Sequence, residues 1–377
     1  MLSILRMTGG SCRLPNINYI NITLMELGIG SFGEVAPAHV AGGDRIAAQR
    51  MQELLALAQT ADASGLDVVA IGEHHRADYL VSAPEVVLGA IASTTQRIRL
   101  SSAVTVLSST DPVRTFQNFS TVDLISSGRA EIIAGRGSFT ESFPLFGQNL
   151  NDYDALFVEK LHLLLKLNES EKVTWQGKHR APIKNLGVYP RPLQAKLPIW
   201  IGVGGTPASA VRAGQLGLPL TIAILGGEPA RYVAFADLYR RSAQEAGHDA
   251  ATLPLALNCH FHVAETAKQA ADEFFPAYSL TMNRIGRERG WPPMSRAQFD
   301  YLCGPQGPLF VGSVQDIIDK LLYLDKLFGN SRFLGQLMLE GMPHEQVRRS
   351  VELFGTQVAP AVREALGVQP VATATVN

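Results

Sequence analysis

The stretch RIRLSSAVTVLSSTDPVRTFQNFSTVDLISSGRAEIIAGRGSF, residues 97–139, decides the fold class. Two apolar runs in it, Ile98–Val106 and Ala130–Ala134, lack the polar alternation of strands that face water, which predicts strands buried on both faces of a parallel sheet. Between them, Asp111 and Pro112 supply an N-cap and a first-turn proline for a helix. The stretch therefore predicts a strand, a helix and a second, parallel strand.

The same alternation continues along the rest of the chain from residue 25. The predicted strands are Leu27–Ser31, Asp67–Gly72, Ile98–Val106, Ala130–Ala134, Pro198–Val203, Pro219–Ile224, Leu253–Val263 and Arg332–Leu339. The other predicted helices are Arg45–Ser64, Asp152–Lys166, Thr206–Leu216, Glu228–Ala246, Thr266–Arg287, Val314–Phe328 and His344–Val358. A strand followed by a helix, about eight times over, is the pattern of an α/β fold of the (β/α)8 TIM barrel type.

We expect residues 25–362 to form this single barrel domain, with an N-terminal extension at 1–24 and a C-terminal tail at 363–377. Two stretches interrupt the repeat. Residues 169–196 predict an inserted hairpin or loop, and residues 290–308, with WPPM and CGPQGP, predict a Pro/Gly-rich excursion. We expect these insertions at the C-terminal face of the barrel, where they would cover the mouth of an active site.

Composition excludes several classes of partner. The chain has 377 residues, 46% of them hydrophobic, and a net charge of −1 without acidic or basic blocks, so neither nucleic acid nor a membrane surface is indicated. Cys12, Cys259 and Cys303 are widely separated, which fits a reducing compartment. Residues 1–24 lack the features of a signal peptide, and no apolar run reaches the roughly 18 residues of a membrane helix. We expect a cytoplasmic protein with small-molecule partners.

The motif GIGSFG, Gly28 to Gly33, matches the GxGxxG pattern of dinucleotide-binding sites. That fingerprint requires a helix directly after the last glycine. Here EVAPAHVAGGD follows, and its Pro37 and paired glycines do not open a helix. The glycines are better explained as room for a ligand close to the end of the first strand.

The stretch IGEHHRAD, Ile71 to Asp78, follows the second predicted strand and lies at the catalytic face of a barrel. Neighbouring side chains of a strand point to opposite faces, so His74 and His75 cannot both face the lumen. A metal would need distant partners, for which the candidates are His260, His262 and Glu340. We expect no metal and predict a single histidine aimed at a ligand, as an acid, a base or a hydrogen-bond donor. An inert loop histidine is the alternative.

Two segments predict a phosphate site. Arg136 follows the fourth strand between two glycines, and its guanidinium suits a phosphate; an ion pair at the barrel rim is the alternative. After the fifth strand, Gly204 and Gly205 precede Thr206 and Ser209 at the start of a helix, whose free N–H groups and dipole favour an anion. Simple N-capping by Thr206 is the alternative there. Together they indicate a ligand such as flavin mononucleotide (FMN) or a sugar phosphate.

These residues resemble the bacterial luciferase-like flavin monooxygenase family from Met25 to about Val362. The resemblance is carried by the stretch at residues 97–139 and by GLDVVAIGEHH, VGGTPASA, FVGSVQDIIDKLL and MPHEQVRRSVELFGTQVAP. It implies a flavin-binding barrel with His74 beside the reactive edge of the flavin and a non-proline cis peptide at Ala103-Val104 beneath the ring. Ser102 and Thr105 are implied to lie near the ring by position. Arg136, Gly204, Gly205, Thr206 and Ser209 match phosphate-binding positions.

The resemblance also implies the chemistry. It predicts a two-component monooxygenase that receives reduced FMN from a separate reductase and uses O2 to oxidise a small organic substrate, and it predicts a homodimer. Phe32, Leu107, Ser108, Glu340 and residues 290–308 occupy the substrate end and match no nameable substrate class. A deazaflavin-dependent hydride-transfer enzyme, a non-catalytic flavin-binding protein and a metal-dependent barrel hydrolase are the alternatives.

Overall fold

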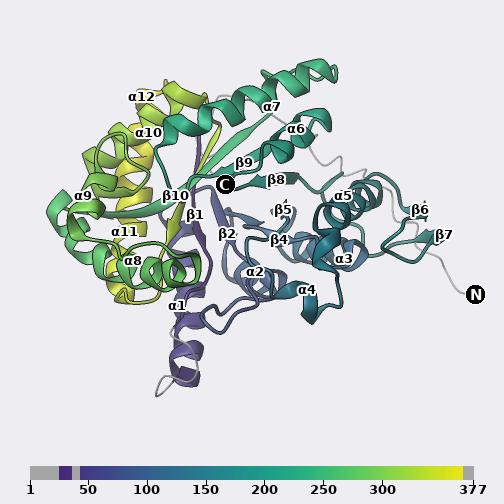
Figure 1. Ribbon diagram of the computed structural model, residues 1–377, viewed down its shortest axis with the longest axis horizontal. Coiled ribbons are helices and arrows are strands. Elements are labelled where there is room, and N and C mark those ends of the chain that lie inside the picture. The colour runs from purple at the N-terminus through teal and green to yellow at the C-terminus, as the bar shows by residue number, and fades with distance from the viewer. Residues whose placement is uncertain (1–24, 36–42, 368–377) are drawn as a thin grey trace, which may run out of the picture.

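The computed structural model describes residues 25–35 and 43–367 and contains a closed parallel barrel, which confirms the predicted fold (Figure 1). Its strands are β1 (Glu26–Ser31), β2 (Val68–Ile71), β3 (Arg99–Ser102), β5 (Ala130–Gly135), β8 (Ile199–Val203), β9 (Leu220–Ala223), β10 (Leu255–Ala264) and β12 (Arg332–Leu337). The barrel closes because β12 pairs with both β1 and β10, and β10 pairs with β9. The predicted extension at 1–24 and residues 368–377 of the predicted tail lie outside the described residues.

Helices surround the strands, as Figure 1 shows. They are α1 (Gly43–Ala63), α2 (Pro84–Thr94), α3 (Pro112–Ile125), α4 (Ser142–Leu145), α5 (Tyr153–Glu169), α6 (Pro207–Gln215), α7 (Val233–Glu245), α8 (Ala267–Arg289), α9 (Arg296–Cys303), α10 (Val314–Phe328), α11 (His344–Leu353) and α12 (Ala359–Ala365). The sequence prediction missed α2, whose N-cap residue Ala83 makes no side-chain capping bond, so the usual start signal is absent. The predicted domain boundary at Val362 falls inside α12. Within the described ranges, no helix has the length and apolar character needed to cross a membrane.

Some predicted boundaries were wrong. The run predicted as one strand at 98–106 is two strands, β3 and the short β4 (Thr105–Val106), with the cis Ala103-Val104 peptide between them. Residues 169–196 contain the predicted hairpin, formed by β6 (Lys172–Trp175) and β7 (Ile183–Gly187), which projects from the side of the barrel (Figure 1). The expectation that this insertion covers the mouth was wrong, because the segment contacts the outer helices and none of its residues lines the cavity there. Residues 290–308 contain α9, and the next strand, β11 (Phe310–Ser313), pairs with the end of β10 and was not predicted.

The lower half of the lumen is filled. Its apolar layer consists of Val68, Ala70, Ile133, Trp200, Ala256 and Leu334. Below this layer the Arg332 guanidinium lies 4.2 Å from the Trp200 ring centre and 2.5 Å from a carboxylate oxygen of Glu131. Arg332 and then Arg99 outweigh the burial of Glu131 and lower the pKa of its carboxyl to about 2. Because side chains close this end, a ligand can enter only at the carboxyl ends of the strands.

Candidate active site

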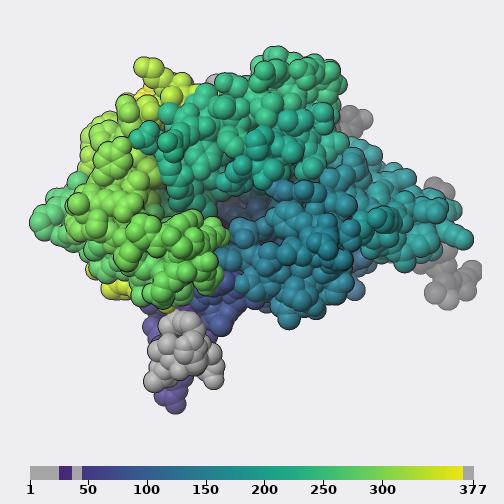
Figure 2. Space-filling view, in the orientation of Figure 1, coloured from purple at the N-terminus to yellow at the C-terminus, as the bar shows by residue number. Residues whose placement is uncertain are grey.

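A cavity of about 400 Å³ opens at the carboxyl ends of the barrel strands. Its wall runs from Gly204, Gly205 and Thr206 at one end to His74 and Phe32 at the other. Figure 2 shows the surface hollowed near the centre, where blue, teal and yellow-green parts of the chain meet. The two regions that the sequence singled out for phosphate binding and for acid–base chemistry therefore share one cavity.

His74 stands in an aromatic surround at its end of the cavity. Its ring stacks on Tyr79 with 4.2 Å between centroids and contacts Phe32 at 5.0 Å and Phe139 at 5.6 Å. Burial lowers the pKa of His74 to about 4, so the imidazole is neutral near pH 7. Its Nδ1 is buried and has no hydrogen-bond partner. A neutral ring with an unpartnered nitrogen can accept or share a proton with a ligand in the cavity.

The neighbours of His74 have different roles. Glu73, which the sequence reading did not select, lines the cavity and is buried. One oxygen of Glu73 accepts a hydrogen bond from the backbone N–H of Val106 at 2.8 Å, and the other lies 2.9 Å from His75 Nε2. His75 is absent from the cavity wall and packs edge-on against Phe146. As predicted, only one of the two histidines faces the lumen, while Glu73 fixes the loop to β4.

Ala103 and Val104 line the cavity between its two ends, and the peptide between them is cis, as the resemblance predicts. Ser102 and Thr105 are fully buried beneath them and hydrogen-bond to each other at 2.9 Å. The structure therefore places the side chains of these two residues behind the wall, next to the Ala103-Val104 peptide.

The opposite end has the features of an anion site. A Cβ placed on Gly204 or Gly205 would meet no atom within 4 Å, so open space lies beside this backbone. Thr206 is the N-cap residue of α6, yet its side chain makes no capping bond. Ser209 is buried in the first turns of α6 but is not part of the cavity wall. The simple-capping alternative for Thr206 is therefore not what the structure shows.

Arg136 reaches the same end of the cavity from β5. Its Nη1 lies 2.5 Å from Asp154 Oδ1, and its guanidinium stands 5.1 Å from the ring centre of Tyr153. The side chain of Asp154 is 71% exposed, so water competes with this ion pair. Arg136 thus forms the rim ion pair that the sequence left open as an alternative, but it also lines the cavity and can exchange Asp154 for a ligand anion.

Arg212 lies on α6, the helix that begins at this end, but it is not part of the cavity wall. Its Nη1 is buried and has no hydrogen-bond partner, although its guanidinium lies 5.5 Å from the ring centre of Phe157. The Arg136 guanidinium, an uncapped helix start and open space beside two glycines are what a phosphate requires. The residues present therefore fit the phosphate of a flavin nucleotide. No sequence motif marked Arg212, since it stands in the middle of an ordinary helix.

Ion pairs connect the loop that carries His74 to α8. Arg76 lies 3.0 Å from Asp78, 2.8 Å from Glu141 and 2.7 Å from Glu288 near the end of α8. The Arg76 guanidinium also stands 4.6 Å from the ring centre of Phe139, which itself contacts His74. Three separate chain segments are therefore held together next to the imidazole.

The candidate metal partners are scattered. His260 packs edge-on against Tyr278, His262 pairs with Glu273 at 2.8 Å, and Glu340 lies 2.7 Å from Arg284. In residues 25–35 and 43–367, no group of three or more His, Cys, Asp or Glu side chains is arranged to hold a metal ion. This arrangement gives no support to the metal-dependent hydrolase.

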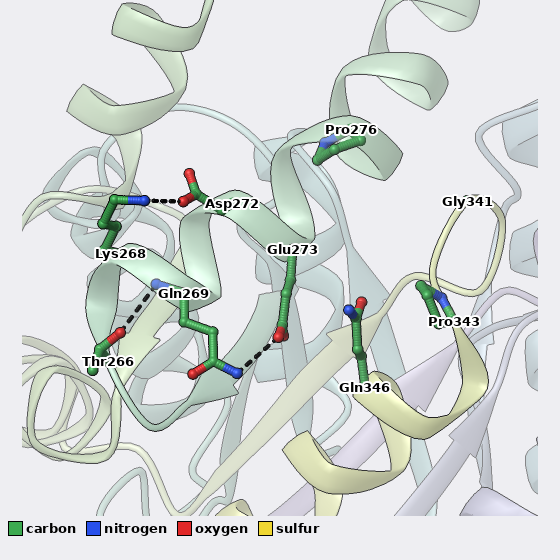
Figure 3. Close-up of a pocket in the computed structure, with 9 residues that line it drawn as sticks. All are labelled: Thr266, Lys268, Gln269, Asp272, Glu273, Pro276, Gly341, Pro343 and Gln346. Atoms are coloured by element: carbon green, nitrogen blue, oxygen red, sulfur yellow. Dashed lines mark hydrogen bonds and ion pairs between the residues drawn. The ribbon is translucent and has the colours of Figure 1, made fainter.

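A second hollow, of about 550 Å³, lies outside the barrel mouth between the start of α8 and the segment before α11 (Figure 3). Its charged groups already have partners: Lys268 lies 2.5 Å from Asp272, and Gln269 donates a hydrogen bond to Glu273 at 2.8 Å. Because this hollow offers no unpaired charge or buried polar group, the chemistry belongs to the cavity that contains His74.

The fold is a (β/α)8 barrel with a candidate ligand cavity at the carboxyl ends of its strands. The profile of the luciferase-like monooxygenase family matches residues 25–330, and the chain belongs to that family, which confirms the resemblance. Over 88% of the chain it is 26% identical to 4-hydroxyprotoasukamycin monooxygenase of Streptomyces nodosus subsp. asukaensis, covering 91% of that protein.

Solved structures share the fold. Monooxygenase RslO1 from Streptomyces bottropensis superposes with a TM-score of 0.77 and 25% identity over 89% of this chain and 99% of that one. The oxygenating constituent of 3,6-diketocamphane monooxygenase of Pseudomonas putida, in complex with FMN, gives 0.70 and 20% identity over 90% and 99%. An F420-dependent secondary alcohol dehydrogenase gives 0.69 and 17% over 90% and 99%. The last two structures are less than 25% identical to this chain, so they show only that the fold is shared. One is bound to FMN and the other depends on F420, so this fold occurs both with FMN and with the deazaflavin F420.

Proposed function

We propose that the protein is an FMN-dependent, two-component monooxygenase that takes reduced FMN from a separate reductase and oxidises a small organic substrate with O2. The observation that carries this proposal is a single cavity with Arg136 and the uncapped start of α6 at one end and a neutral, largely buried His74 at the other. Membership of the luciferase-like family supports it. Bound reduced flavin would supply the two electrons with which one atom of O2 enters the substrate and the other leaves as water.

The chain's own residues position the cofactor. Arg136 and the backbone N–H groups at Gly205 and Thr206 would hold the phosphate, since they surround the open end of the cavity. The Ala103-Val104 peptide forms the wall between the two ends and would support the flavin ring. Such positioning fixes the reactive edge of the ring relative to His74.

His74 would accept or donate a proton during the reaction. Because burial keeps its imidazole neutral near pH 7, Nδ1 can accept a proton from, or share one with, a group beside the flavin edge. The aromatic rings of Phe32, Tyr79 and Phe139 exclude water from one side of the imidazole. The Arg76 ion pairs hold α8 next to this loop, which limits access of solvent to the same place.

We also propose a cytoplasmic homodimer. At the end of α3, Leu124 and Ile125 are 46% and 51% exposed. Apolar side chains grouped in this way favour a protein–protein contact. Sedimentation of the purified chain would test this; a monomer at micromolar concentration would contradict it.

A deazaflavin-dependent hydride-transfer enzyme is the second candidate, because the same fold occurs in an F420-dependent dehydrogenase. The purified protein should first be titrated anaerobically with reduced FMN, with reduced F420 as the comparison. The FMN complex should then be mixed with oxygenated buffer in a stopped-flow spectrometer, with and without aldehyde, ketone and thioether substrates. Binding of FMN with substrate-dependent O2 consumption supports the proposal. Binding of F420 alone would favour hydride transfer, and binding of neither would overturn the phosphate-site assignment.

A further inference from the structure

The cavity wall that faces the Ala103-Val104 peptide carries two polar side chains, Thr221 on β9 and Asn258 on β10. In the closed barrel, β10 lies four strands from β3 in either direction, through β5, β8 and β9 or through β2, β1 and β12. β10 is therefore across the lumen from the end of β3, where that peptide stands. Since the proposed flavin ring rests against Ala103-Val104, Thr221 and Asn258 would face the other side of the ring, which is the side left for a substrate.

The two side chains are neighbours on the lumen face of the sheet. β9 and β10 pair in parallel, with Thr221 opposite Ala256 and Ala223 opposite Asn258. Residues two apart along a strand share a face, so Ala256 in the apolar floor and Asn258 both point into the barrel. Asn258 thus lies one step above Thr221 on the adjacent strand, and both residues line the cavity.

Both side chains have hydrogen-bonding groups to spare. The hydroxyl oxygen of Thr221 is buried and has no hydrogen-bond partner in the described chain. The side chain of Asn258 makes one hydrogen bond to the described residues, from Nδ2 to the carbonyl of Leu334 at 3.2 Å, so its second N–H and its amide oxygen remain available. Buried polar groups are nearly always satisfied, so this part of the wall points to a polar group that a ligand brings.

The formal charges of the wall are already committed. Among the described residues that line the cavity, Arg136 is the one permanent cation, and the proposed function assigns it to the phosphate of the cofactor. The carboxylate of Glu73 contacts the N–H of Val106 with one oxygen and His75 with the other. An anion next to Thr221 would therefore lose its hydration without gaining a counterion, whereas a neutral polar group would not meet this cost.

The residues that the sequence assigned to the substrate end do not supply this subsite. Of Phe32, Leu107, Ser108 and Glu340, only Phe32 lines the cavity, and residues 290–308 contribute nothing to its wall. Leu107 and Ser108 are fully buried behind the wall, and Glu340 is paired with Arg284. The polar groups available to a substrate are therefore those of β9 and β10, together with His74.

We propose that Thr221 and Asn258 form a substrate subsite that takes the carbonyl oxygen of an uncharged ketone or aldehyde. A carbonyl oxygen has two lone pairs, so it can accept one hydrogen bond from the Thr221 hydroxyl and one from the free N–H of Asn258. Carboxylates and sulfonates are rejected because the subsite offers them no cation. This inference rests on the proposed function and adds to it a substrate class and two specificity residues.

The experiment uses the complex of the full chain with oxidised FMN and three probes built on one ring. They are cyclohexanone, methylenecyclohexane, which has the same shape without the oxygen, and cyclohexanecarboxylate. Changes in the visible absorbance of bound FMN give the dissociation constants near pH 7. Cyclohexanone labelled with carbon-13 at the carbonyl reports hydrogen bonding, because its carbonyl resonance moves downfield when the oxygen accepts hydrogen bonds.

The variants are Thr221→Val, Thr221→Ser, Asn258→Leu and the matched control Thr281→Val. Thr281 is another buried threonine whose hydroxyl has no partner in the described chain, but it does not line the cavity. Thr221→Val and Asn258→Leu should each weaken cyclohexanone binding about 3- to 10-fold and reduce the downfield shift, without weakening methylenecyclohexane or FMN. Thr221→Ser and Thr281→Val should bind cyclohexanone like the wild type, which itself should bind cyclohexanecarboxylate at least about tenfold more weakly.

Each other outcome overturns a stated claim. Equal losses of cyclohexanone and methylenecyclohexane in Thr221→Val would mean that Thr221 only shapes the wall. A loss of FMN affinity in place of cyclohexanone affinity would assign the two side chains to the cofactor and end the substrate subsite. Tighter binding of the carboxylate than of the ketone, or no binding of the ketone, would overturn the substrate class while FMN binding leaves the proposed function standing. Failure of the wild type to bind any flavin would overturn the proposed function itself. Melting temperatures identify a variant that has not folded.

Discussion

Replacing Gly202 with alanine should damage the cavity wall at a defined place. A Cβ at this position would lie 2.6 Å from Cγ1 of Val104, whereas its next neighbour, Cγ2 of Ile133, is at an ordinary 3.4 Å. Val104 must therefore move by nearly 1 Å to reach a normal contact. Since Val104 lines the cavity, the free direction for this movement is toward the flavin site.

The cost of this overpacking is about 1 to 3 kcal/mol. The entropy of unfolding grows with chain length, so for a chain of 377 residues this loss of stability lowers the melting temperature by about 1 to 4 °C. If the FMN complex is destabilised by about 1.4 kcal/mol more than the free protein, FMN binding weakens about tenfold. Differential scanning calorimetry and a flavin fluorescence titration measure the two effects separately.

A second substitution tests the cause. Val104→Ala removes the only side-chain atom that the new methyl group would strike, so the double variant Gly202→Ala/Val104→Ala should recover most of the lost FMN affinity. Gly89→Ala, in α2 with no atom within 4 Å of the added Cβ, is the matched control and should be neutral or slightly stabilising. Wild-type FMN affinity in Gly202→Ala, or no recovery in the double variant, would refute the assignment of Val104 to the flavin wall.

Four further predictions concern single residues. Arg136→Ala should weaken FMN binding by about 1.5 to 3 kcal/mol and spare riboflavin; equal losses in titrations of both would contradict this. Asp154→Asn removes a competing carboxylate from Arg136 and should tighten FMN binding up to about fivefold, and weaker binding would show that Asp154 helps to hold the ligand. His74→Ala should retain FMN binding yet slow turnover. Nitrogen NMR of the wild-type imidazole should show no titration above about pH 5, because the pKa of His74 is lowered to about 4. A titration midpoint near pH 6.5 would instead show that the ring is exposed to water. Arg332→Met leaves Glu131 charged and buried and should cost about 3 to 5 kcal/mol in denaturant unfolding, whereas a loss below 1 kcal/mol would show that Glu131 is protonated or hydrated.

The barrel could be predicted because its signals are local. Each parallel strand is a short apolar run, and several helices have readable ends: Asp111 accepts hydrogen bonds from the N–H groups of Val113 and Arg114 at the start of α3. The missed α2 shows the limit of this approach, since Ala83 provides no capping side chain and Pro84 opens the helix without a polar start signal.

That Gly204, Gly205 and Thr206 line one end of the cavity could also be predicted, because they form one continuous segment at the start of a helix. The ion pair of Arg136 with Asp154 could not be assigned from the sequence, since Asp154 stands on another element. Nothing in the local sequence shows that Arg136 lines the same cavity, or that α5 presents Tyr153 and Asp154 to it. A side chain whose role depends on a distant charge carries no local sequence signal.

The same reasoning explains why the surroundings of His74 escaped prediction while His74 itself did not. Strand alternation alone separated His74 from His75. The partners that define its state come from far along the chain: Arg76 meets Glu288 across 212 residues, and Glu73 meets Val106 across 33. Burial among these segments lowers the pKa of His74, so its imidazole is neutral only when the folded chain brings the segments together. Substitutions in α8, such as Glu288→Gln, should therefore alter the environment of an imidazole that they do not touch, through the Arg76 contact with Phe139.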